Sequence, residues 1–234
     1  MIYELNHLGI LVRDIEASLD FYGRLDARVV FHETIVGTPV QIAYMQLAGG
    51  LVEFIYDPES LTPLPYGADH LAFLSDDLDA DYGRLLDAGC LDATPPKPAG
   101  TGIGRLGFVL TPDGARLELL QRDLDLRIPE PDDALALFLD HFAYAAASTD
   151  DAARLFAGVL GMEPVGESRF RFGADAIELT TPAPSGPRFP HLALRVASID
   201  QAAATLESRG VAVERTPDGA RLTDPDGLDI LLSA

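Results

Sequence analysis

The sequence predicts an α+β protein made of four βαβββ modules in two paired halves. A short phrase, in which a histidine opens an apolar run, occurs four times and takes four of the five histidines of the chain, namely His7, His70, His141 and His191. A segment with the apolar spacing of a helix follows each phrase, and strand-like runs follow each of these segments. Because chance is a poor explanation for this placement, the internal repeat sets the domain organisation.

The first module is expected to begin with a strand at residues 3–12. A helix follows near residues 15–25, with Asp14 as its expected N-cap. Three strand-like runs come next, at residues 28–33, 40–47 and 51–56, and Ala48-Gly49-Gly50 is expected to form the tight turn before the last of them.

The second module begins at His70, after a proline-rich connector at residues 57–68. Its helix is expected near residues 78–88, with Gly89 as the C-cap. The prolines and glycines of residues 95–104 predict a loop, which is either a mobile lid beside the site or a plain hairpin connector. Two strands, at residues 105–110 and 115–121, complete the module.

An acidic stretch with two prolines predicts the linker between the halves, and residues 134–139 within it suggest a short helix. The predicted domains are a first half at residues 1–122, a linker at 123–139 and a second, shortened half at 140–234. The third module is expected to have a helix at 151–159, strands at 169–172 and 176–180 and a loop at 182–190, and the fourth a helix at 199–209 and strands at 211–215, 220–223 and 228–232.

Composition narrows the class of partner. A net charge of −20 argues against a nucleic-acid backbone or an anionic membrane surface as a partner. Cys90 is the only cysteine, which excludes an intrachain disulfide and suits a reducing compartment. The sequence lacks a signal-peptide pattern and any apolar run near the roughly 20 residues that span a bilayer. We expect a soluble, cytoplasmic monomer or homodimer that acts on a small-molecule substrate.

Each module also has an acid on its closing strand, flanked by apolar residues. These acids are Glu53, Glu118, Glu178 and Asp229. An acid in such a run points to one face of its strand, and that face is either wet or lines a site where the charge is compensated. The first half thus offers His7, Glu53, His70 and Glu118, and the second half offers His141, Glu178, His191 and Asp229 as a possible second or degenerate site.

Two imidazoles and two carboxylates form a mixed nitrogen and oxygen ligand set. This set suits one divalent metal ion with open coordination positions, such as Ni, Co, Zn, Mn or Fe. Open positions let a metal act as a Lewis acid on substrate oxygens. Any one of these residues alone is more often a packing or surface residue, so the prediction rests on their joint periodicity.

The repeat resembles the vicinal oxygen chelate superfamily, which includes glyoxalase I, methylmalonyl-CoA epimerase, extradiol dioxygenases and the fosfomycin- and bleomycin-resistance proteins. The motifs that carry the resemblance are the sixteen residues from His7, Val52-Glu53, Asp69-His70-Leu71-Ala72-Phe73, and Pro112-Asp113-Gly114 before Leu117-Glu118-Leu119. The resemblance implies mixed sheets curled into open cups around a metal, with the helices outside. By position, His7, Glu53, His70 and Glu118 match the four metal ligands of bacterial-type glyoxalase I.

The chain departs from the individual branches at other positions. Leu11 and Asp57 stand where glyoxalase I has the arginine and the asparagine that hold glutathione, so the use of a thiol co-substrate stays open. Gln41 stands at the position of the epimerase base. The resemblance therefore implies a class of chemistry and leaves the substrate open.

The expected function is a metal-dependent isomerase, epimerase or lyase of the glyoxalase type. It would act on a small hydroxy- or oxo-carbonyl substrate through an enediolate, with Glu118 or Glu53 as the base. The alternatives are a non-catalytic binding protein of the resistance type and an Fe(II) extradiol-type dioxygenase. Module pairing is also open, although pairing within each half is favoured over a swapped arrangement because the first half has the complete glutamate set.

Overall fold

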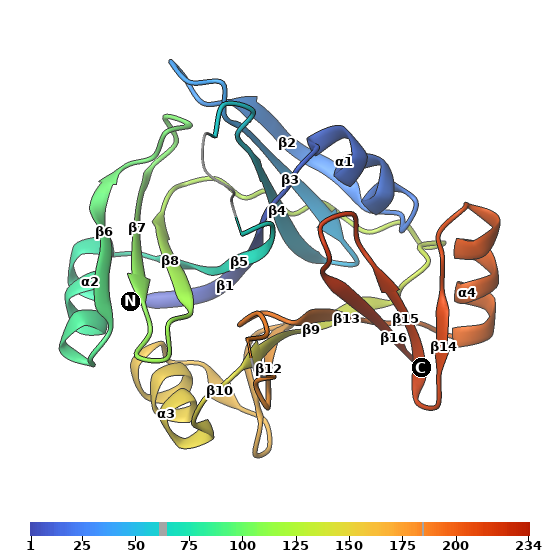
Figure 1. The fold of residues 1–234 in the computed structure, drawn as a ribbon. Coiled ribbons are helices and arrows are strands. Elements are labelled where there is room, and N and C mark those ends of the chain that lie inside the picture. Colours follow the sequence, from blue (N-terminus) through green and yellow to red (C-terminus); the bar gives the residue numbers. More distant parts are fainter. Residues whose placement is uncertain (61–64, 184) are drawn as a thin grey trace.

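A computed structural model of the protein describes residues 1–60, 65–183 and 185–234. It contains two eight-stranded mixed sheets, each curled but not closed, with the helices on their outer sides (Figure 1). The predicted α+β fold of βαβββ modules in two halves is confirmed. Part of the predicted connector at 57–68, namely residues 61–64, and residue 184 of the predicted loop at 182–190 lie outside the described residues.

The first sheet has the strand order β2-β3-β4-β1-β5-β8-β7-β6. Its elements are β1 (Ile2–Leu11), α1 (Ile15–Gly23), β2 (Arg28–Thr34), β3 (Gln41–Leu47), β4 (Gly50–Tyr56), β5 (Gly67–Ser75), α2 (Leu78–Asp87), β6 (Leu91–Pro98), β7 (Arg105–Leu110) and β8 (Arg116–Gln121). β1 and β5 pair antiparallel at the centre, and each pairs in parallel with the closing strand of its own module, β4 or β8. Modules one and two therefore share one sheet, which is the pairing that the sequence favoured.

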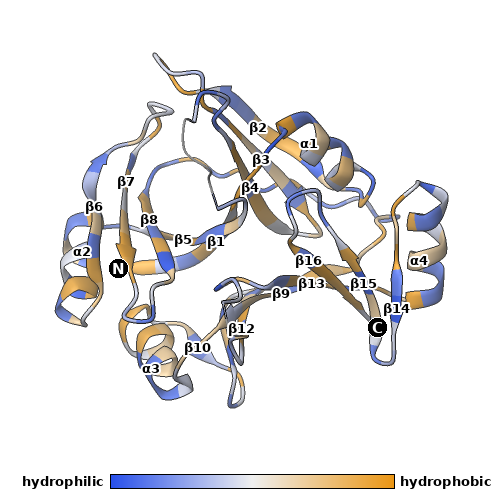
Figure 2. Ribbon diagram, viewed as in Figure 1, coloured by the Kyte–Doolittle hydropathy of each residue, from blue (hydrophilic) through white to orange (hydrophobic). Residues whose placement is uncertain are grey.

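The second sheet repeats this order as β10-β11-β12-β9-β13-β16-β15-β14. Its elements are β9 (Phe138–Ala145), α3 (Thr149–Ala153), the π-helix η1 (Arg154–Val159), β10 (Glu163–Pro164), β11 (Arg169–Phe172), β12 (Asp175–Thr180), β13 (His191–Arg195), α4 (Ile199–Ser208), β14 (Glu214–Thr216), β15 (Gly219–Thr223) and β16 (Asp229–Ser233). Apolar residues follow the strands of both sheets, whereas the helices also carry hydrophilic residues (Figure 2).

A capping side chain marks the start of each α-helix. Asp14 accepts hydrogen bonds from the backbone N–H groups of Glu16 and Ala17, as the N-cap prediction required. Asp77 caps α2 in the same way, and Ser148 and Ser198 cap α3 and α4. These caps fix where each helix leaves the strand that carries its histidine.

Two local predictions were wrong. Residues 95–98, predicted as loop, belong to strand β6, which lies at the edge of the sheet, where a proline without an N–H group costs no ladder hydrogen bond. The helix predicted at 134–139 is absent, because the N–H groups of Leu137 and Leu139 donate to Arg195 and Ala48 in neighbouring segments. The helix predicted at 151–159 is present, as a short α-helix that continues as a π-helix.

Two tyrosine–aspartate pairs tie the halves together. The Tyr22 hydroxyl donates to Asp224 at 3.1 Å, and the Tyr144 hydroxyl donates to Asp113 at 2.7 Å. Each aspartate lies in the turn before the closing strand of its module, β16 or β8. Module one therefore contacts module four, and module two contacts module three.

Candidate metal centre

Four buried side chains meet on the concave face of the first sheet. They are His7 on β1, Glu53 on β4, His70 on β5 and Glu118 on β8, and their ligand atoms all lie within 4.8 Å of one another. The His7 and His70 Nε2 atoms are 3.4 Å apart. The Oε2 atoms of Glu53 and Glu118 lie 3.3 and 3.4 Å from His7 Nε2, and 3.5 and 3.4 Å from His70 Nε2. The sequence-predicted ligand set of the first half is thus brought together.

Strand register explains the convergence. Glu53 lies opposite Gly9, two residues after His7, and Glu118 lies opposite Ala72, two residues after His70. Because side chains two residues apart share a face of a strand, each acid points to the same side as the histidine of its module. Gly9 is required here, since a Cβ at this position would stand 2.1 Å from Cε1 of His70.

A second layer of residues orients both histidines. His7 Nδ1 lies 2.9 Å from Asn6 Oδ1, which also accepts from Arg122. His70 Nδ1 lies 2.9 Å from Asp69 Oδ2, which also accepts from Arg116. Both acceptors require a proton on Nδ1, and so a neutral ring directs its Nε2 lone pair at the other ligands.

The charges of the centre are strongly coupled. Burial raises the pKa of the Glu53 and Glu118 carboxyls, but the adjacent imidazoles outweigh this effect and hold both values below the ordinary one. Burial lowers the pKa of His70, but its hydrogen bond to Asp69 and the nearby carboxylates of Glu118 and Glu53 outweigh burial and raise that pKa well above 6.5. Without another cation, the centre therefore retains a proton on His70.

A divalent metal ion fits this donor set. When both rings are neutral, two imidazole lone pairs and two carboxylates converge, and none of them can donate a hydrogen bond to another. The buried Glu118 Oε2 also has no hydrogen-bond partner. Such a group is costly to bury unless a cation compensates it. Two imidazoles and two carboxylates would hold the ion and leave positions open for substrate oxygens.

The second half brings together its histidines but not its acids. His141 and His191 have their Nε2 atoms 3.3 Å apart. Glu178 instead accepts from the Ser168 hydroxyl at 2.6 Å, and Asp229 accepts from the Thr223 hydroxyl at 2.8 Å. Across residues 1–60, 65–183 and 185–234, the group in the first half is the one that meets the geometry of a metal site.

Register gives the reason for Asp229, which the sequence comparison of single acids missed, whereas Glu178 keeps the register of Glu53. Asp229 lies opposite His191 itself, and the position opposite Ala193, which corresponds to that of Glu118, holds Leu231. Pro190 also stands before His191, where the other copies of the phrase have a polar residue. Burial and the neighbouring His141 lower the pKa of His191 to about 4.

The remaining candidates lie away from the centre. His32 is exposed and pairs with Gln41 at 3.1 Å. Cys90 is buried, and burial together with the charge of Asp113 raises the pKa of its thiol to about 11, so that the reactive thiolate is scarce at neutral pH. Residues 99–104 form the turn between β6 and β7, and their role as a lid stays a prediction.

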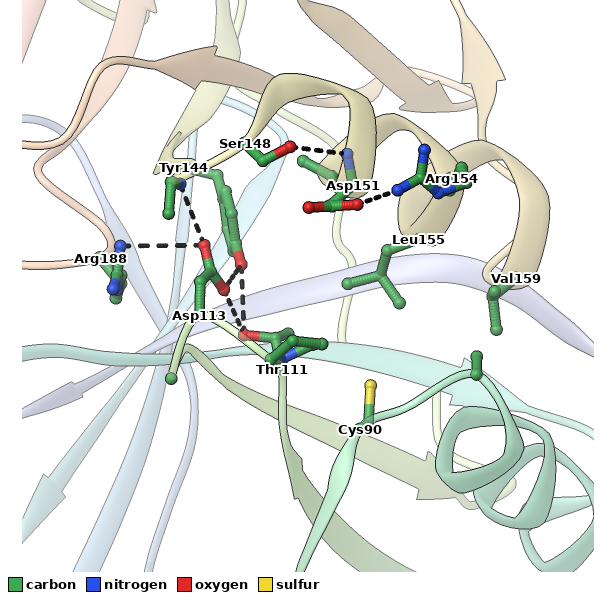
Figure 3. Close-up of a pocket in the computed structure, with 15 residues that line it drawn as sticks. Cys90, Thr111, Asp113, Tyr144, Ser148, Asp151, Arg154, Leu155, Val159 and Arg188 are labelled. Carbon is green, nitrogen blue, oxygen red and sulfur yellow. Dashed lines mark hydrogen bonds and ion pairs between the residues drawn. The ribbon is translucent and has the colours of Figure 1, made fainter.

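A separate cavity of about 960 Å³ lies between modules two and three (Figure 3). Cys90, Leu155 and Val159 line it, and Figure 3 shows Asp113 with its dashed contacts to Thr111, Tyr144 and Arg188 on one side. Because Asp113 already accepts from Thr111, Tyr144 and the Ala147 N–H group, its carboxylate serves the contact between the halves.

Sequence reasoning missed the second layer of the centre. Asn6, Asp69, Arg116 and Arg122 carry it. A signal was available, because a polar residue with an acceptor oxygen directly precedes the histidine in three of the four phrases, as Asn6, Asp69 and Asp140. The arginines had no such signal, since their contacts depend on the curl of the sheet. Among the described residues, no helix has the length and apolarity to cross a membrane.

Comparison with known proteins adds a family and a set of similar folds. A model of the Glyoxalase/Bleomycin resistance protein/Dioxygenase superfamily matches residues 4–119 and 138–232. The uncharacterized protein YwbC of Bacillus subtilis (strain 168) is 30% identical over 129 residues, which cover 52% of this chain and 100% of the relative.

Among solved structures, the Mn(II)-bound glyoxalase from Novosphingobium aromaticivorans matches with a TM-score of 0.66 and 19% identity, over 99% of this chain and 81% of the other. The 2,3-dioxygenase LapB from Pseudomonas sp. KL28 matches with a TM-score of 0.70 and 15% identity, over 98% and 91% of the two chains. Homoprotocatechuate 2,3-dioxygenase from Arthrobacter globiformis matches with a TM-score of 0.68 and 17% identity, over 99% and 79%. At these identities the likeness is one of fold.

Proposed function

The chain belongs to the glyoxalase/bleomycin resistance protein/dioxygenase superfamily, and from that premise we propose that it is a divalent-metal-dependent isomerase, epimerase or lyase. Its substrate in this proposal is a small hydroxy- or oxo-carbonyl compound with two neighbouring oxygens. The observation that carries the proposal is the buried convergence of His7, Glu53, His70 and Glu118 within 4.8 Å. A chain that only binds a ligand has no need to bury two carboxylates against two imidazole lone pairs.

A divalent ion held by these four residues would act as a Lewis acid toward the two substrate oxygens and stabilise the charge of the enediolate. The chain itself would supply the base. Glu118 is the first candidate, because its Oε2 atom is buried and has no hydrogen-bond partner, and Glu53 is the second. Protonated imidazoles hold both pKa values low in the free centre. A bound divalent ion would also favour the ionised carboxylate, so the base would be present in its unprotonated form.

The halves would have different roles. In this proposal residues 1–122 form the catalytic half, residues 123–139 form the linker, and residues 140–234 form a shortened half with a degenerate site. The separated acids Glu178 and Asp229 support the last part, since each is already engaged by a hydroxyl group of its own half.

The test begins with metal content. Protein purified without chelators or added metal is expected to hold about one equivalent of Ni, Co, Zn, Mn or Fe per chain, in line with one four-ligand site. The His70→Ala variant should lose both the metal and turnover of hydroxy- or oxo-carbonyl substrates. Retained turnover in that variant, or failure of the native protein to take up any of these metals, would overturn the proposal.

The second candidate is an Fe(II) ring-cleaving dioxygenase. The similarity to the two dioxygenase structures supports it, because it extends over both halves of this chain. In this chain the iron would lie in the first half, because the second half does not gather its acids. Oxygen consumption with catechols by the Fe(II)-loaded protein, together with no isomerase activity, would favour this candidate over the first.

A further inference from the structure

Arg122 differs from the other arginines in its charge environment. Fourteen of the sixteen arginines form ion pairs with carboxylates in the described part of the chain, as expected when acids outnumber bases 37 to 17. Arg122 and Arg195 are the two that form none there. Arg122 is half-buried one residue after the end of β8, the strand of Glu118. A guanidinium without a carboxylate partner in so acidic a chain calls for an explanation.

The guanidinium of Arg122 is only partly satisfied. Its Nη1 donates to the Tyr44 hydroxyl at 3.3 Å, and its Nη2 donates to Asn6 Oδ1 at 2.9 Å. Its Nε atom is buried and has no hydrogen-bond partner. The Cζ atom also lies 5.1 Å from the centre of the Tyr44 ring, which orients the group from one side.

Both partners of Arg122 contact the metal centre. Asn6 holds His7 Nδ1, and the Tyr44 ring packs against the His7 ring with centroids 5.0 Å apart. Tyr44 also lies opposite Glu53 in the register of β3 and β4. The free donor of Arg122 is therefore one side chain away from the ligands, on the same concave face of the sheet.

A small cavity of about 10 Å³ lies in front of this arginine. Tyr44 and Arg122 form its polar side, and Ile103, Leu124 and Leu126 are among the apolar residues around it. Because the cavity is small, a ligand would enter only if side chains of the turn at 99–104 or of the linker move. Apolar cover strengthens a charged contact, because it excludes water from it.

We propose that Arg122 recognises a carboxylate of the substrate, and that the substrate class is a vicinal-oxygen compound with a carboxylate beyond its two metal-binding oxygens. This inference rests on the proposed function. The planar guanidinium has donors suited to a carboxylate. A chain with a net charge of −20 repels an anionic substrate in general, so a dedicated cation beside the centre is needed to hold one.

Two hydroxamates test this proposal on the full-length protein loaded with Co(II). Acetohydroxamate chelates through two neighbouring oxygens, and succinic monohydroxamate adds a carboxylate to the same chelating group. The Co(II) absorption spectrum reports the binding of each. We expect the carboxylated probe to bind about 10- to 100-fold more tightly, which is the range for a charge-assisted hydrogen bond.

Three variants test whether Arg122 causes the preference for the carboxylated probe. Arg122→Met should abolish it, so that the Co(II)-saturated variant binds the two probes with equal affinity, and Arg122→Lys should keep part of it. Arg195→Met is the matched control, because it removes the other arginine without an ion pair, and it should bind both probes as the native protein does. Equal affinities in the native protein, or a full preference in Arg122→Met, would contradict the proposal.

Two further outcomes separate the inference from the proposed function. Loss of Co(II) binding in both Arg122→Met and Arg122→Lys would assign Arg122 to the positioning of His7 through Asn6 and overturn its role in recognition. Native protein that binds no Co(II) would instead overturn the proposed function itself.

Discussion

His70 and His191 open equivalent strands of the two sheets, yet their surroundings move the two pKa values in opposite directions. A hydrogen bond to Asp69 and the nearby carboxylates of Glu118 and Glu53 outweigh burial and raise the pKa of His70 well above 6.5. Burial and the nearby His141 lower the pKa of His191 to about 4. A histidine at the repeated position is therefore not sufficient for a metal site, because the site depends on whether carboxylates reach it.

The difference between the halves comes from two positions around the histidines. In module two, Glu118 lies opposite Ala72, two residues after the histidine. In module four, Leu231 lies opposite the corresponding residue, Ala193. Gly9 lets the His70 ring enter the first centre, whereas Ala143 occupies the corresponding place opposite Glu178. The second half keeps the fold and the histidine pair but lacks the convergence of charge.

The largest expected effect comes from the ligands themselves. His70→Ala should weaken metal binding by more than about 100-fold, because it removes one of four ligands, a greater loss than that of an orienting partner. His191→Ala is the matched control and should leave metal stoichiometry unchanged, as measured by elemental analysis. Equal metal loss in the two variants would show that the halves are not different in the way proposed.

The orienting residues give the next largest effect. Asp69→Ala removes the acceptor of His70 Nδ1 and should lower metal affinity by about 10- to 100-fold. Asp140 accepts from His141 Nδ1 at 2.7 Å in the same way, so Asp140→Ala is a close control with no expected effect on metal affinity. Competition with a chromophoric chelator measures both. Unchanged metal affinity in Asp69→Ala would show that the second layer does not contribute to metal binding.

Packing at the centre gives a smaller effect. Gly9→Ala places a Cβ atom 2.1 Å from the His70 ring, so it should lower the free energy of unfolding by about 1–3 kcal/mol and displace that imidazole. Ala143→Gly, at the corresponding position of the second half, should cost no more than about 1 kcal/mol. Chemical denaturation measures both values. A Gly9→Ala variant with native stability and native metal affinity would contradict the close approach of the ring.

The smallest expected effect is a dependence of stability on pH. The pKa of His191 is about 4 in the folded chain and near 6.5 when unfolded, so the unfolded state binds the proton first as pH falls. Stability should therefore fall between pH 6.5 and pH 4, by about 1–2 kcal/mol after allowance for the partly exposed ring. His191→Asn should remove this part of the pH dependence in metal-free protein. A His191 resonance that titrates near 6.5 in NMR spectra would contradict it.

Most of the fold could be predicted because its signals are local. The repeated phrase, the caps such as Asp14 and the turns marked by glycine all lie within a few residues of the element that they define. The prediction that was wrong at residues 95–98 also rested on a local signal. Prolines 95, 96 and 98 form part of a strand because that strand lies at a sheet edge, and edge position is not written in the strand's own sequence.

The sequence by itself determined the four modules, the histidine and acid candidates and the resemblance that placed His7, Glu53, His70 and Glu118 in one set. Only the tertiary structure decided that the modules pair within each half, that Asp229 is two residues out of register with Glu118, and that Arg122 contacts Asn6 without a carboxylate partner in the described chain. The physical reason is that residue type and spacing are properties of a segment. Register between strands, the curl of a sheet and the compensation of buried charge depend instead on segments far apart in the chain.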